Sequence, residues 1–113
     1  MREGVRLAVD VGSVRVGVAR SDPDGILASP LTVVRSGPSE LDELATLVAG
    51  ADAIEVIVGL PTSLSGREGL AAAAARSFAA ELAGRLAPIP VRLVDEAFGA
   101  VRAALRDIHG SAG

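Results

Sequence analysis

Three acidic residues have the side chains and positions needed to hold a metal ion. Asp10 lies inside the apolar segment 7–22, and Asp95 and Glu96 stand at the end of a later apolar run. An unpaired buried carboxylate is costly, whereas hard cations such as Mg²⁺ prefer oxygen ligands. If the strands that carry them are neighbours, Asp10 and Glu96 can share one cation. The alternatives are that Asp10 caps a turn and that Asp95 and Glu96 form a solvated strand end.

Two glycines near Asp10 suit the same site. Gly12 is placed to make a tight turn, and Gly17 leaves the adjacent strand without a side chain. A missing side chain lets a phosphate or an ion approach the backbone closely. The alternative interpretation is that both are ordinary hairpin glycines.

The elements that position Asp10 are predicted to form a three-stranded meander. Residues 7–10 and 14–20 are rich in strand formers and are separated by a short turn at 12–13, which indicates a β-hairpin. Residues 26–35 predict a third strand, in which Pro30 marks a bulge or a sheet edge because proline cannot donate to the ladder.

A helix and a buried strand are predicted to follow the meander. Ser39 and Asp42 fit a capping box, apolar residues over 41–48 recur at helical spacing, and Gly50 is expected to end the helix. Residues 54–60 form a continuous apolar run, which is typical of a strand covered on both faces.

A long helix is predicted over residues 67–87, with an apolar residue at every fourth position and Pro88 at its end. Residues 89–95 predict a strand, so the strand-helix-strand order favours a right-handed parallel crossover. A short helix over 101–108, closed by Gly110, is expected last. The order β-β-β-α-β-α-β-α predicts one α/β domain with a mixed five-stranded sheet of the ribonuclease-H-like type.

Composition limits the classes of function. The chain has 113 residues, a formal net charge of −3, no cysteine, and arginine as its only strong base. Its length suits one domain, and the missing cysteine excludes disulfides and thiolate metal sites. No apolar run approaches the roughly 20 residues that cross a bilayer, so we expect a cytoplasmic protein with no membrane partner. The net charge argues mildly against a nucleic-acid partner but allows a local arginine patch.

Three sequence blocks, in order, resemble the YqgF/RuvX family. The first runs Asp10-x-Gly12-x-x-Arg15-x-Gly17-x-Ala19 and continues into Ser21-Asp22-Pro23. The others are Val58-Gly59-Leu60-Pro61 with Gly66, and Val94-Asp95-Glu96. Members of this family are described as pre-16S rRNA nucleases and as Holliday junction resolvases.

The resemblance implies a ribonuclease-H-like fold and phosphodiester hydrolysis assisted by two divalent ions, Mg²⁺ or Mn²⁺. At the matching positions, Asp10 is similar to the first catalytic carboxylate and Glu96 to the second, with Asp95 as a further metal ligand. Substrate would be structured RNA or branched DNA, and junction cleavage would suit a homodimer. Arg15 and Arg67 would hold backbone phosphates, because planar guanidinium groups match phosphate oxygens, and Gly12 and Gly17 would admit them.

The sequence departs from the family pattern near its end. Residues 97–100 replace an arginine and a threonine pair, and Asp107 follows Glu96 too closely to match the family's third catalytic aspartate. We therefore expect residues 1–113 to form a single domain that lacks the family's C-terminal helix and tail. His109 is not needed as a base, because metal chemistry activates water without one.

Two other functions compete with the nuclease interpretation. The first is a catalytically weak nucleic-acid-binding or interaction domain that keeps the fold without the third carboxylate. The second is an actin-like or sugar-kinase-like ATPase, whose phosphate loop also begins with Asp-x-Gly on a hairpin. Such ATPases need two domains around the nucleotide, and 113 residues are too few for both.

Overall fold

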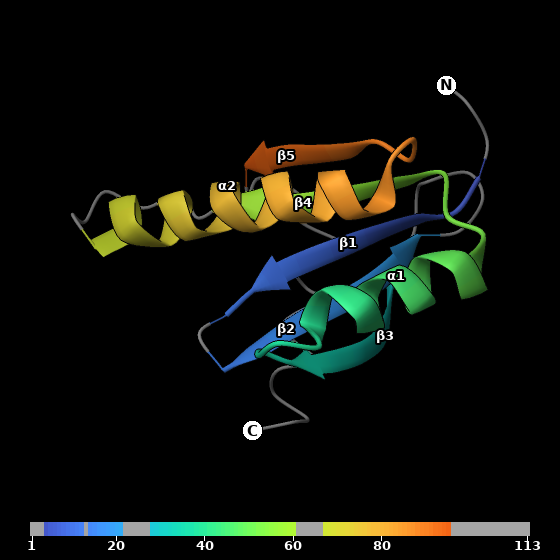
Figure 1. The fold of residues 1–113 in the computed structure, drawn as a ribbon, viewed down its shortest axis with the longest axis horizontal. Coiled ribbons are helices and arrows are strands. Elements are labelled where there is room, and N and C mark those ends of the chain that lie inside the picture. The colour runs from blue at the N-terminus through green and yellow to red at the C-terminus, as the bar shows by residue number, and fades with distance from the viewer. Residues whose placement is uncertain (1–3, 13, 22–27, 61–66, 96–113) are drawn as a thin grey trace.

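Five strands form one sheet in the order β3-β2-β1-β4-β5 (Figure 1). The computed structural model describes residues 4–12, 14–21, 28–60 and 67–95. The elements in chain order are β1 (Arg6–Val11), β2 (Arg15–Ser21), β3 (Ala28–Arg35), α1 (Glu40–Ala51), β4 (Glu55–Leu60), α2 (Arg67–Leu86) and β5 (Val91–Asp95).

The sheet is mixed, as predicted. β1, β2 and β3 pair antiparallel, whereas β1, β4 and β5 pair parallel. A meander followed by parallel crossovers is the ribonuclease-H-like arrangement expected from the sequence. The predicted last helix, over 101–108, lies outside the described residues.

Pro30 marks both an edge strand and a bulge, which confirms the prediction made for it. β3 lies at one edge of the sheet, where a residue without an N–H is tolerated. Val18 pairs with Thr32 but Ala19 pairs with Pro30, so Leu31 is an extra residue in the ladder. This one-residue insertion shifts the register of the β2–β3 pair.

The predicted capping box at the start of α1 is wrong. Ser39 occupies the N-cap with φ −95° and ψ 1°, and its side chain makes no capping hydrogen bond. A capping hydroxyl normally belongs to an extended backbone, which Ser39 does not have. Glu40, rather than Asp42, reaches back, and its Oε2 accepts a hydrogen bond from the Gly37 N–H at 3.2 Å.

The end of α1 also differs from the prediction. Gly50 lies within the helix, which continues to Ala51 and is capped by Asp52 in the left-handed conformation. Aspartate is one of the few non-glycine residues that adopts this conformation readily. The Asp52 N–H donates to the Ala49 carbonyl at 3.1 Å.

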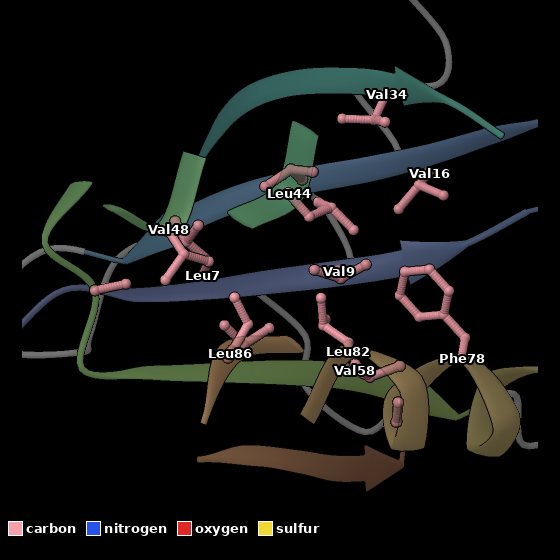
Figure 2. Packing of buried hydrophobic residues seen from close by; sticks show 14 of the residues in the cluster. Leu7, Val9, Val16, Val34, Leu44, Val48, Val58, Phe78, Leu82 and Leu86 are labelled. Carbon is pink, nitrogen blue, oxygen red and sulfur yellow. The ribbon is translucent and has the colours of Figure 1, made fainter. Parts of the chain in front are cut away.

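Both helices cover the same face of the sheet and enclose the core (Figures 1 and 2). Alternate strand residues point into this layer. The strands contribute Leu7, Val9, Val16, Val18, Val34, Val56 and Val58, and the helices contribute Leu44, Val48, Ala75, Phe78, Ala79, Leu82 and Leu86. The core is thus almost entirely aliphatic, because the chain contains only two aromatic residues, both phenylalanine.

The predicted apolar stripe of α2 is only half correct. Phe78, Leu82 and Leu86 are buried, but Leu70 and Ala74 are exposed. Residues spaced by four advance about 40° around a helix with 3.6 residues per turn, so an extended series leaves the buried face.

The middle of the sheet face opposite the helices is also buried. On this face Ala8, Ala19 and Ile57 are buried, which confirms that β4 is covered on both sides. Near the amino end of β4, Glu55 accepts a hydrogen bond from Arg6 Nε at 3.0 Å and forms an ion pair with Arg92, whose Nε lies 3.0 Å from Glu55 Oε2. This cross-strand pairing of opposite charges stabilises the β1–β4–β5 register.

The turn between β1 and β2 requires glycine at position 12. A Cβ atom added to Gly12 would lie 2.7 Å from the backbone oxygen of Arg15, so we expect Gly12→Ala to lower the free energy of unfolding by about 1–3 kcal/mol. Gly84 in α2 has open space around the same position, and Gly84→Ala should raise stability by about 0.5–1 kcal/mol. Urea denaturation of the two variants measures both effects, and equal effects of the same sign would contradict the turn geometry.

Candidate metal and phosphate site

Asp10 lies on the face of the sheet that α1 and α2 leave uncovered. Leu7 and Val9 point into the core beneath the helices (Figure 2), and side chains alternate along a strand. Asp10 therefore belongs to the opposite face, where it is partly exposed near the carboxyl end of β1. Its antiparallel partner is Gly17, so no side chain of β2 stands directly beside the carboxylate.

The other predicted ligands come from β5 and the residue after it. The last β1–β4 pair is Val9 with Val58, so the next residue, Asp10, lies level with Gly59. Gly59 in turn pairs with Val94 of β5. Asp95 ends β5, and the carboxyl ends of β1, β4 and β5 thus meet at one edge, where ligand sites collect in α/β sheets. The side chain of Asp95 and all of Glu96 lie outside the described residues.

The strands that carry Asp10 and Asp95 are not neighbours, because β4 lies between them. The simple neighbour arrangement considered from the sequence is therefore wrong. Strands are spaced about 4.8 Å apart, so these two backbones are separated by about 10 Å. Leu93 of β5 packs against the core, so by alternation the position of Asp95, two residues later, belongs to the helix-covered face and not to the face of Asp10. A cation held by Asp10 beside Gly59 would therefore need a second ligand other than Asp95.

Hydrogen bonds fix the turn beside Asp10. The Gly12 N–H donates to the Arg15 carbonyl at 2.9 Å, and the Ser36 N–H donates to the Val14 carbonyl at 2.9 Å. The hydroxyl of Ser36 also donates to the Gly12 carbonyl at 3.2 Å. The predicted turn role of Gly12 is confirmed, and Ser36 joins this turn from the end of β3.

Arg15 shares a face with Asp10. Val16 points into the core, so Arg15 and Gly17, its neighbours in β2, belong to the other face. Arg67 is the first residue of α2, and its side chain is outside the described part of the chain. The structure thus brings together four of the predicted residues, namely Asp10, Gly12, Arg15 and Gly17, and leaves the placement of Arg67 and Glu96 as a prediction.

The chemistry of this site suits a hard divalent cation. Asp10 offers carboxylate oxygens, which Mg²⁺ and Mn²⁺ accept, and Gly17 leaves space beside them. Within residues 4–12, 14–21, 28–60 and 67–95, no group of three histidine, cysteine or acidic side chains could hold a metal ion. Among the described helices, none is long and apolar enough to span a membrane.

Comparison with solved structures supports the fold. Residues of this chain superpose on Thermus thermophilus RuvC, solved in complex with a Holliday junction substrate, with a TM-score of 0.59 and 16% identity, over 82% of this chain and 64% of that one. Archaeoglobus fulgidus Pelota matches with a TM-score of 0.53 and 17% identity, over 97% of this chain and 34% of that one. These likenesses show a common fold.

Curated relatives share far more sequence with the chain. A protein of Thermobifida fusca is 65% identical over 105 residues, and one of Nocardioides is 54% identical over 114 residues. A protein of Streptomyces coelicolor is 57% identical over 105 residues. All three carry the provisional name pre-16S rRNA nuclease. The alignments include 93%, 95% and 91% of this chain but 66%, 73% and 63% of the relatives.

The sequence also matches a family profile over nearly its whole length. Residues 4–112 match the profile described as RuvX, Holliday junction resolvase. The three motif blocks, the mixed sheet and the high identity to curated relatives agree with this match. The chain therefore belongs to the RuvX family.

Proposed function

We propose that this chain is a metal-dependent endonuclease that hydrolyses phosphodiester bonds in structured nucleic acid. The observation that carries the proposal is the position of Asp10 opposite Gly17, at the carboxyl ends of the parallel strands. On the same face Arg15 provides a guanidinium group that suits phosphate oxygens. The family and the names of its curated relatives support the same chemistry.

In this proposal Asp10 and Glu96 hold Mg²⁺ or Mn²⁺, whereas Asp95, a ligand in the sequence-based interpretation, is left out because its position in β5 belongs to the other face of the sheet. A divalent cation so held would supply positive charge that activates water and stabilises the leaving oxygen. The chain itself orients the substrate, because Gly12 and Gly17 allow the sugar-phosphate backbone to approach and Arg15 and Arg67 bind phosphates. The single histidine, His109, has no role in this scheme.

Two substrates fit the proposal. The curated relatives are named for the 16S rRNA precursor, and the family profile is described by the Holliday junction. Both present phosphates to the same site. We place the activity in the cytoplasm, where bacterial rRNA precursors and chromosomal DNA are found, and a homodimer would suit a symmetric junction.

A second candidate function is nucleic-acid binding with little or no cleavage. Ala97, Phe98, Gly99 and Ala100 stand where the family pattern has an arginine and a threonine pair. The loss of a cation beside carboxylates removes compensating charge. This departure favours a binding domain if the remaining ligands do not suffice for catalysis.

An assay with two substrates separates these functions. A precursor 16S rRNA fragment and a four-way DNA junction are each incubated with the 113-residue chain in Mg²⁺, in Mn²⁺ or in EDTA, with a linear DNA duplex as the control substrate. The proposal expects cleavage of one structured substrate in the presence of metal and none in EDTA. Binding of either substrate without cleavage in any metal would support the second function.

A further inference from the structure

Two arginines lie directly opposite each other in the β2–β3 ladder. Arg15 pairs with Arg35. The adjacent hydrogen bond from the Ser36 N–H to the Val14 carbonyl marks this as a non-hydrogen-bonded pair, the type in which facing side chains approach most closely. Like charges at such positions destabilise a sheet. The pair therefore lowers the stability of the fold, and its presence calls for a role other than folding.

The β-bulge creates this pairing. If the register of the outer pairs, such as Ala19 with Pro30, continued unchanged, Arg15 would face Val34. The extra residue Leu31 moves the ladder by one position, which returns Val34 to the core. A one-residue shift exchanges the faces of a strand, so the bulge also brings Arg35 to the face that carries Asp10.

No carboxylate neutralises the pair within the described part of the chain. Arg6 and Arg92 bind Glu55, and Arg85 binds Asp42, whereas neither Arg15 nor Arg35 makes an ion pair there. Both belong to the face of Asp10, and their row lies two residues before Gly17 in β2, toward the turn, whereas Gly17 shares its row with Asp10. At about 3.4 Å per residue, the two rows are about 7 Å apart.

We propose that Arg15 and Arg35 together bind one backbone phosphate of the nucleic acid, close to the bond that is cleaved. This inference rests on the proposed function and adds Arg35 to the binding residues. Two guanidinium groups can each present paired N–H donors to phosphate oxygens, and the bound anion offsets their mutual repulsion. Ser36, the residue after Arg35, fixes this corner by its hydrogen bond to the Gly12 carbonyl.

Binding of a four-way DNA junction in EDTA, measured against salt concentration, tests the pair. Arg35→Gln should weaken binding about tenfold or more and should reduce the slope of log K against log salt by about 0.9. Arg76→Gln is the matched control, because Arg76 is exposed on α2, which covers the other face. It removes the same charge and should change the affinity by less than about threefold.

Thermal unfolding tests whether Arg35→Gln has a folding defect. Removal of one of two facing like charges should leave the melting temperature of Arg35→Gln unchanged or higher. If Arg35→Gln and Arg76→Gln bind equally well, the paired-arginine site is overturned while the nuclease proposal stands. If the unaltered chain binds neither the junction nor the rRNA fragment, the proposed function itself fails.

Discussion

Replacement of Asp10 by asparagine is expected to reduce metal-dependent cleavage by on the order of 100-fold or more. Asparagine keeps the size of the side chain but loses the negative charge that a hard cation requires. Loss of groups that merely orient metal ligands already costs about 10–100-fold in affinity or activity. The rate is measured on whichever structured substrate the unaltered chain cleaves, at saturating Mg²⁺ or Mn²⁺.

Asp52→Asn is the matched control for this variant. Asp52 is an exposed residue that precedes β4, at the opposite end of the sheet, and has a positive φ of 53°. Asparagine adopts this conformation as readily as aspartate, so the control should retain full activity. If Asp10→Asn cleaves within about threefold of the unaltered chain, Asp10 is not a metal ligand in the reaction.

Replacement of Leu82 by alanine is expected to lower the free energy of unfolding by about 2–5 kcal/mol. Leu82 is 0% exposed and lies in the middle of the contact between α2 and the sheet (Figure 2). Truncation removes buried apolar surface and leaves a cavity. Domains have a free energy of unfolding of only about 5–15 kcal/mol, so this one substitution would remove a large part of the stability of the domain.

Leu70→Ala is the corresponding control in the same helix. Leu70 is 78% exposed, and surface substitutions usually change stability by about 0.5 kcal/mol or less. The midpoints of chemical denaturation of the two variants should therefore differ clearly. Similar losses in both variants would mean that α2 does not pack on the sheet through Leu82.

Much of this fold follows from local sequence patterns. The hairpin around Gly12 is marked by strand formers on either side of a turn, and the apolar run 54–60 predicts a strand buried on both faces. Pro30 indicates a strand irregularity because it lacks an N–H. Each of these signals depends on a few neighbouring residues, and the structure confirms each of them.

Sheet order and helix ends were harder to predict. Whether β4 lies between β1 and β5 depends on contacts between distant segments, which no local pattern encodes. Ser39 has the residue type of a capping residue but not the backbone geometry, and Asp52 provides the helix end expected at Gly50. Several residues compete for each helix terminus, and tertiary contacts decide among them.

Some residues of the candidate site can likewise be identified from local sequence, and others cannot. Asp10 and Gly12 are identifiable from residue type and spacing, because a carboxylate in an apolar strand and a glycine in a tight turn each need an explanation. Arg35 and Ser36 are not identifiable in this way. Their proximity to Gly12 and Arg15 results from the β2–β3 register, which the bulge at Leu31 sets.

The shared cation site is tested most directly by Mn²⁺ affinity, followed by electron paramagnetic resonance, in Asp10→Asn, Glu96→Gln and the double variant. Two ligands of one ion are coupled, so their effects do not add. We predict that each single variant weakens Mn²⁺ binding about tenfold or more and that the double variant binds little more weakly than either. Unchanged binding in Glu96→Gln, or losses that multiply in the double variant, would contradict a cation held by both carboxylates.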